Sequence, residues 1–256
     1  MRDETLDIPV DGQHIAGTLL TPDQPAAAAP SVIFVHGWGA SQEQYLARAS
    51  EVAALGCVCL TFDLRGHAKT QPQHETVSRG DNLRDVLAAY DLLAGHRGVD
   101  PSVIAVVGSS YGGYLGAILT SLRAVRWLAL RAPALYKDAD WELPKRQLHH
   151  DPDLSAYRRR TVRPEDNRAL CACEAFRGDV LLVESEHDHT VPHPVLANYL
   201  AACGQVHSLT YRVIEGADHG LSEESWRQTY TSILVSWLTE MTAGARDKQA
   251  TEVTGR

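Results

Sequence analysis

Two adjacent serines, Ser109 and Ser110, lie in a glycine-rich stretch that reads VIAVVGSSYGGYLGAIL from residue 103. Only one register gives the spacing Gly-x-Ser-x-Gly, and it runs from Gly108 through Ser110 to Gly112. An apolar strand pattern precedes it and a helical pattern follows, which is the context of a strained turn that exposes a serine hydroxyl. A tight connection or a phosphate-binding loop is the alternative, but the dinucleotide and Walker patterns are absent. We therefore expect Ser110 to be a nucleophile and Ser109 to be its neighbour.

A serine hydroxyl becomes nucleophilic when a base takes its proton and a carboxylate orients that base. The candidate base is His219, in the stretch GADHGL after the last expected strand. The candidate carboxylate is Asp188, in ESEHDHTVP just past an earlier strand. The chain order serine, aspartate, histidine suits a nucleophile of this type. Competing carboxylates and imidazoles lie in the same two stretches, namely Glu184, Glu186, Asp218, His187, His189 and His193.

A tetrahedral intermediate also needs two backbone N–H donors for its oxyanion. One is expected from Tyr111, directly after the nucleophile. The other is expected from Trp38, in the turn HGWGAS that follows the strand SVIFVHG. An ordinary glycine turn is the alternative for Trp38, and its pairing with the Ser110 turn favours the oxyanion hole.

Apolar strand patterns alternate with helical patterns along the chain, which predicts a doubly wound, mostly parallel sheet with helices on both faces. The first two strand patterns, TLDIPV and HIAGTLLTP, are typical of an antiparallel edge hairpin. The later strands are expected over residues 31–37, 57–63, 102–110, 125–133, 178–188 and 206–219. Helices are expected over residues 41–56, 78–96, 112–123, 192–204 and 222–241.

One α/β domain is expected over residues 1–242, with a small cap insertion at about 132–177 and a polar, disordered tail at 243–256. Such an insertion lies over the carboxyl edge of a parallel sheet, where ligands bind. Trp141 and Tyr136 of the cap insertion are candidates for lining a substrate pocket, with burial in the core as the alternative.

Composition excludes several classes of function. The chain has 256 residues, a net charge of −8 and five cysteines. The acidic charge argues against a nucleic-acid partner, and no apolar run is long enough for a membrane helix. The odd number of cysteines and a charged N-terminus without a signal pattern predict a cytoplasmic protein. Neither a metal site nor a cofactor is expected, because the Cys-x-Cys pairs lack zinc spacing. The oligomeric state cannot be predicted.

From about Leu6 to Met241 the chain resembles the α/β-hydrolase superfamily. The resemblance rests on the His36-Gly37 turn, DLRGHAKT from residue 63, the Ser110 turn, HDHTVP and GADHGL. Within the superfamily it is similar to capped esterases of the dienelactone-hydrolase and feruloyl-esterase type, and GSSYGG resembles the turn of the prolyl-oligopeptidase family. Relatives often carry glycine where this chain has Ala68.

The triad and the resemblance together predict a serine hydrolase that cleaves a small-molecule carboxylic ester through an acyl-enzyme. A peptidase or amidase acting on short acyl- or aminoacyl-peptides is the second interpretation. The third is a non-catalytic binding module on a hydrolase scaffold, because a fold does not fix a function.

Overall fold

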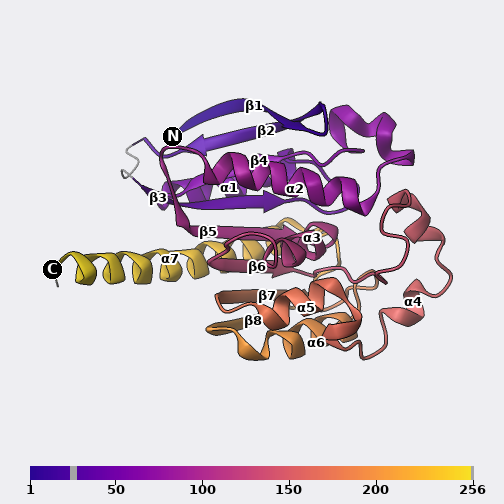
Figure 1. The fold of residues 1–256 in the computed structure, drawn as a ribbon. Helices are drawn as coiled ribbons and strands as arrows, with labels where there is room; N and C mark the ends of the chain where they lie inside the picture. Colours follow the sequence, from indigo (N-terminus) through magenta and orange to yellow (C-terminus); the bar gives the residue numbers. More distant parts are fainter. Residues whose placement is uncertain (24–27, 255–256) are drawn as a thin grey trace.

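An eight-stranded sheet runs through the whole molecule, which is described here by a computed structural model of residues 1–23 and 28–254 (Figure 1). The strand order is β1-β2-β4-β3-β5-β6-β7-β8. The first two strands form an antiparallel hairpin, β2 is antiparallel to β4, and all later pairs are parallel. The strands are β1 (Arg2–Val10), β2 (Gln13–Thr21), β3 (Ala29–Val35), β4 (Val58–Phe62), β5 (Val99–Ser109), β6 (Trp127–Arg131), β7 (Asp179–Ser185) and β8 (Ser208–Ile214). The expected mostly parallel sheet and its edge hairpin are confirmed.

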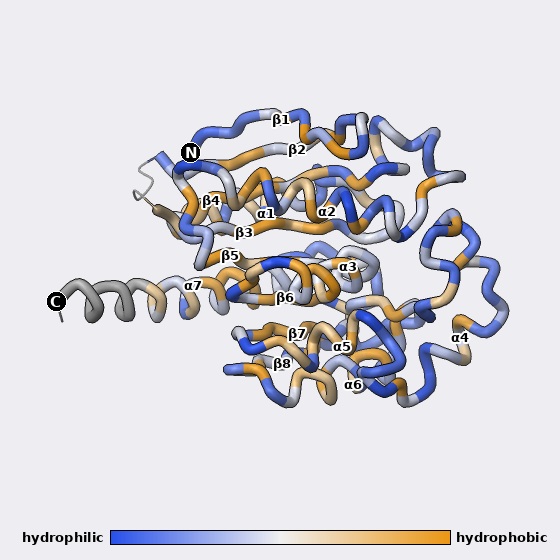
Figure 2. Tube along the Cα trace, in the orientation of Figure 1, coloured by the Kyte–Doolittle hydropathy of each residue, from blue (hydrophilic) through white to orange (hydrophobic). Residues whose placement is uncertain are grey.

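Helices cover both faces of this sheet. One face carries α1 (Glu43–Ala54) and α7 (Glu224–Thr254), and the other carries α2 (Arg79–Ala94), α3 (Tyr111–Leu119), α5 (Arg168–Ala175) and α6 (His193–Ala202). Successive strand residues point to opposite faces, so that Ala105 and Val107 of β5 pack under α1 and α7 while Val106 packs on the other side. Figure 2 shows the resulting apolar strands between helices. Within the described residues, no helix is both long and apolar enough to cross a bilayer.

The cap insertion divides into two parts. Its first part holds a 3₁₀ helix, η2 (Lys145–His150), a short α4 (Leu154–Tyr157) and a further 3₁₀ turn, η3 (Pro164–Asp166), and it lies past the carboxyl edge of the sheet (Figure 1). Its last part, α5, packs instead against α3 and α6 in the main core. Apolar spacing within RALCACEA explains the difference, because it buries Ala169, Leu170 and Cys173.

The last helix is longer than the sequence analysis expected. It continues past Met241 to Thr254, through most of the segment 243–256 that was expected to be disordered. That segment contains several residues with high helix propensity, such as alanine, lysine and glutamine, and no proline. The remaining residues of the tail, 255–256, lie outside the described residues, as do residues 24–27 of the Pro/Ala loop.

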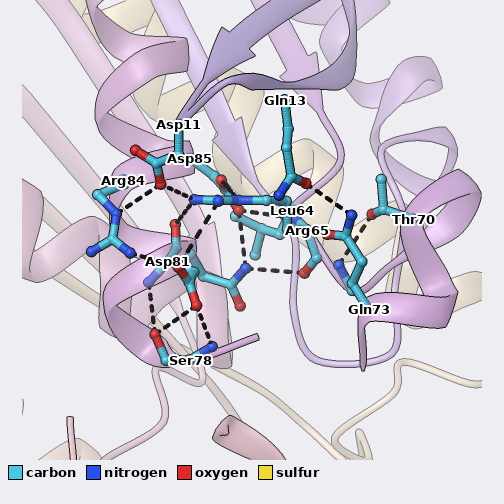
Figure 3. A network of polar contacts seen from close by, with 12 residues as sticks. Asp11, Gln13, Leu64, Arg65, Thr70, Gln73, Ser78, Asp81, Arg84 and Asp85 are labelled. Atoms are coloured by element: carbon cyan, nitrogen blue, oxygen red, sulfur yellow. Dashed lines mark hydrogen bonds and ion pairs between the residues drawn. The ribbon is translucent and has the colours of Figure 1, made fainter. Parts of the chain in front are cut away.

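A buried polar network fixes the loop after β4 against α2 (Figure 3). The Nε of Arg65 donates to Asp85 at 2.5 Å, and its Nη2 donates to Asp11 in the β1–β2 turn at 2.9 Å. The Ser78 hydroxyl accepts from the backbone N–H of Asp81, and the Asp81 carboxylate accepts from the backbone N–H of Ser78. This reciprocal cap starts α2. The network thereby ties the loop after β4 to α2 and to the β1–β2 turn.

Candidate active site

The Gly-x-Ser-x-Gly stretch forms the strained turn that its pattern predicts. Strand β5 ends at Ser109, α3 begins at Tyr111, and Ser110 between them has φ 51° and ψ −116°. A non-glycine residue at positive φ is energetically unfavourable and persists only where neighbours enforce it. The neighbours here are the end of β6 and the segment that follows it, because the Ser110 N–H donates to the carbonyl of Arg131 and the Ser110 carbonyl accepts from the N–H of Ala134.

Two glycines allow strand and helix to approach at this turn. A Cβ on Gly108 would lie 2.6 Å from the carbonyl oxygen of Gly112, and a Cβ on Gly112 would lie 2.1 Å from that of Val35. Both distances are far below van der Waals contact. Glycine is therefore required at both positions for packing, and Ser110 is held at the carboxyl edge of the sheet.

Ser110, His219 and Asp188 meet at this edge from three separate loops. The Ser110 hydroxyl donates to His219 Nε2 at 3.0 Å, and His219 Nδ1 donates to Asp188 Oδ2 at 2.6 Å. The other Asp188 oxygen accepts from the backbone N–H groups of Thr190 and Val191 at 2.8 and 2.7 Å. The His219 side chain stays 25% exposed, while that of Asp188 is 2% exposed. In this arrangement His219 can take the Ser110 proton.

The competing carboxylates of the same stretches are engaged elsewhere. Glu184 accepts hydrogen bonds from His193 Nδ1 and from the Tyr211 hydroxyl. Glu186 accepts from the backbone N–H of Gly216, and Asp218 accepts from Ser222. Asp188 is the carboxylate that bonds His219.

The turn that carries Trp38 is fixed by a buried neutral histidine. His36 Nδ1 donates to the Gly37 carbonyl at 2.8 Å, and its Nε2 accepts from the Leu64 N–H at 3.0 Å. Burial lowers the pKa of His36 to about 4, which suits this neutral pairing. The indole ring of Trp38 packs edge-on to the Tyr111 ring, with centroids 5.3 Å apart. Tyr111 is the first residue of α3, so its amide has no acceptor within the helix.

A buried lysine beside these two aromatic rings was missed by the sequence analysis. Lys145 of η2 is fully buried, and its Nζ lies 4.8 Å from the Trp38 ring centroid and 5.1 Å from that of Tyr111. It donates to Asn82 Oδ1 at 3.0 Å. Burial lowers the pKa of Lys145 to about 7. A lone lysine in a polar stretch gives no sequence signal of burial, because its position depends on how the cap insertion folds back.

The two cap residues expected to line a substrate pocket lie farther along the same aromatic cluster. Tyr136 is buried and packs edge-on to Tyr111 at 6.0 Å. Trp141 is half-buried, 6.2 Å from Tyr114, with guanidinium groups close to its ring. The structure brings both against aromatic side chains of α3, the helix that follows Ser110. The described residues also contain no cluster of three or more potential metal ligands.

The model of the family described as "Alpha/beta hydrolase family" matches residues 32–231. The chain belongs to the alpha/beta hydrolase family. No curated protein matches the sequence.

Solved structures share the fold across nearly the whole chain. Dienelactone hydrolase from Anabaena variabilis is 17% identical, with a TM-score of 0.65 over 93% of this chain and 97% of that one. Est1E from Butyrivibrio proteoclasticus, with ferulic acid bound, is 18% identical, with a TM-score of 0.67 over 96% and 99%. The acylaminoacyl peptidase of Pyrococcus horikoshii is 16% identical, with a TM-score of 0.70 over 92% of this chain and 41% of that longer one. The superfamily resemblance inferred from the motifs is confirmed.

Proposed function

We propose that the protein is a serine hydrolase that cleaves carboxylic esters through an acyl-enzyme. The observation that carries this proposal is the continuous hydrogen-bond chain from Ser110 through His219 to Asp188, at 3.0 and 2.6 Å. Such a chain gives the hydroxyl a base and fixes the tautomer of that base. It occurs on a turn whose backbone strain is typical of an exposed nucleophile.

The proposed reaction has two halves. The Ser110 oxygen bonds to the ester carbonyl carbon while its proton moves to His219 Nε2, and the amides of Tyr111 and Trp38 hold the resulting oxyanion. The bond from carbon to the alcohol oxygen then breaks, and the leaving alkoxide takes the proton from His219. Water repeats both steps on the acyl-enzyme, with His219 as base. Each oxyanion donor contributes on the order of 10²–10³ in rate.

An organophosphorus probe tests this assignment directly. A fluorophosphonate should form one adduct, which mass spectrometry maps to Ser110, and Ser110→Ala should lose both the adduct and turnover of p-nitrophenyl acetate. Ser109 remains in that variant and serves as an internal control. Labelling of the Ser110→Ala protein at wild-type extent, or unchanged turnover, would overturn the proposal. Comparing the acetate ester with aminoacyl anilides separates esterase from peptidase activity.

A further inference from the structure

A row of polar side chains ends the apolar pattern on the α1/α7 face of the sheet. Ser109, Arg131 and Ser185 each come two residues after a core residue of that face, at the carboxyl ends of β5, β6 and β7. Side chains two apart on a strand share a face. Accordingly, Arg131 donates from Nε to the Ser109 hydroxyl and from Nη1 to the Ser185 hydroxyl, both at 3.4 Å.

Arg131 is a buried cation without a carboxylate partner. The residue is 7% exposed, and no carboxylate of the described residues lies within ion-pair distance of its guanidinium. Its shortest hydrogen bond is from Nη1 to the His219 carbonyl, at 2.8 Å. Burying a charge is unfavourable unless it is paired. The site therefore holds a positive charge that an external anion could neutralise.

A cavity of about 400 Å³ opens in front of Arg131 and adds two further arginines. Arg48 of α1 and Arg227 of α7 also line it, none of its lining residues is acidic, and neither arginine forms an ion pair among the described residues. The Tyr230 hydroxyl at its wall is buried beside Ser109 but makes no hydrogen bond of ordinary geometry within the described residues. The cavity thus combines guanidinium and hydroxyl donors, and none of the residues that line it supplies a negatively charged acceptor.

Two acidic side chains line an adjoining groove. Glu51 and Glu224 line that groove, which shares Arg48 and Arg227 with the cavity. Neither glutamate comes within ion-pair distance of these arginines, and Glu224 accepts a hydrogen bond from Gln228 instead. The three guanidinium groups consequently have no carboxylate partner among the described residues, and Arg48 instead donates from Nε to the Thr231 hydroxyl and stacks on the Tyr230 ring.

We propose that this pocket binds a small oxyanion, a carboxylate or phosphate group, beside the loop that carries His219. Guanidinium groups match the geometry of both anions through paired N–H donors, and tyrosine and serine hydroxyls supply further donors. The volume lies within the range of small-molecule sites. The protein's net charge of −8 disfavours non-specific anion binding to the rest of its surface.

Two of the arginines also hold the His219 loop. Arg131 donates to the carbonyl of His219, and Arg227 Nη1 donates to the carbonyls of Leu221 and Ser222 at 2.9 and 2.6 Å. An anion that binds both guanidinium groups therefore contacts the two side chains that hold this loop at His219 and at the residues that follow it. Binding in the pocket is coupled by these bonds to the position of His219.

Titration calorimetry on the Ser110→Ala protein tests the pocket without requiring any activity. Inorganic phosphate or acetate should bind saturably, and Arg48→Gln and Arg227→Gln should each weaken that binding by roughly tenfold or more. Arg212→Gln, at an exposed arginine on β8, is the matched control and should bind like the parent. Circular dichroism verifies that each variant is folded. Absence of saturable binding, or equal binding by all variants, would overturn the proposal. Arg131 and Arg227 would then only hold the backbone of the His219 loop.

A kinetic comparison then identifies the source of the anion, and this part rests on the proposed function. Turnover of p-nitrophenyl acetate is compared with that of the p-nitrophenyl monoester of succinic acid, which carries a free carboxylate. If the anion belongs to the substrate, phosphate competes with the succinate ester, and the ratio of kcat/KM for the succinate ester over the acetate ester falls in both variants. If it is a free effector, phosphate changes turnover of both esters equally and the ratio is unchanged. Either result supports an oxyanion pocket.

Discussion

Each oxygen of the Asp188 carboxylate has its own hydrogen-bond donors. One accepts two backbone N–H groups, and the other accepts the His219 Nδ1–H. An asparagine at this position would keep its carbonyl on the backbone donors and turn its NH₂ toward His219. The neutral imidazole would then carry its proton on Nε2. That nitrogen could no longer accept the proton of Ser110.

We therefore expect Asp188→Asn to lower kcat for p-nitrophenyl acetate by on the order of 10⁴, without unfolding the protein. Asp218→Asn is the matched control, since Asp218 adjoins His219 in sequence but bonds Ser222. Steady-state kinetics on both variants measures the effect. Comparable losses in the two variants would contradict the role given to Asp188.

Ala68 stands where relatives often carry glycine, and it has φ 45° in this structure. The left-handed conformation is unfavourable for alanine and not for glycine. Ala68→Gly should accordingly raise the free energy of unfolding by up to about 1 kcal/mol. The same change at exposed Ala47, inside α1, should lower it by about 1 kcal/mol. Urea denaturation measures the change in the free energy of unfolding in both variants. A lower free energy of unfolding for Ala68→Gly would contradict the argument from the backbone conformation.

At the scale of elements, the buried side chain of Lys145 anchors η2 to α2. Lys145 reaches Asn82 of α2, and its backbone N–H donates to the Val77 carbonyl at 2.8 Å. The first part of the cap insertion is thus tied to the segment that starts α2. Burial holds the pKa of Lys145 near 7, below its ordinary value of 10.5. Between these values the unfolded chain binds one more proton than the folded one.

The unfolding free energy should therefore rise as the pH increases from about 7.5 to 9.5, by up to about 1.4 kcal/mol per pH unit from this group. Lys145→Met removes the titrating group and should flatten the rise over that interval. Lys69→Met, at an exposed lysine of the 3₁₀ helix η1 (Ala68–Glu75), should keep it. Urea denaturation at several pH values distinguishes the two, and an equal rise in both variants would exclude Lys145 as its source.

Sequence patterns predicted those elements whose signals are local. Apolar strand patterns located the sheet, and the spacing around Ser110 located its turn. The positions of Lys145 and Arg131 could not be predicted, because each is buried by partners distant in sequence. No helix was expected at the residues that form α5, which fell within the expected cap insertion, because the sequence does not show the surface against which such a short apolar segment packs. Arg131 lies in the strand expected over 125–133, and alternation puts it on the same face as Ala129, but the pattern does not show that this end of the strand is buried.

At the scale of the whole molecule, two buried histidines limit acid stability. Burial lowers the pKa of His36 to about 4, and burial together with Lys145 lowers that of His67 to about 3. Their ordinary pKa is 6.5. Below that value the unfolded chain binds protons that the folded chain excludes, so stability falls as the pH decreases.

We expect the unfolding free energy to fall between pH 6.5 and 5, by up to about 1.4 kcal/mol per pH unit for each histidine. His67→Asn should reduce this slope, and His14→Asn, at an exposed position of β2, should not. Carboxylates with lowered pKa values, such as Asp11, stay ionised in this interval and do not contribute. Urea denaturation at half-unit pH steps gives the slopes. A slope that is the same in all three proteins would rule out His67.

The two glycines of the Ser110 turn also constrain how such a chain can change over evolutionary time. Any side chain at Gly112 would collide with the carbonyl of Val35, and any at Gly108 with that of Gly112. Most single substitutions elsewhere cost little by comparison. Chains that share this fold at 16–18% identity illustrate how widely the remainder can diverge. The cap insertion of this protein can therefore diverge far more readily than the Ser110 turn, where almost no substitution at the two glycines would be neutral.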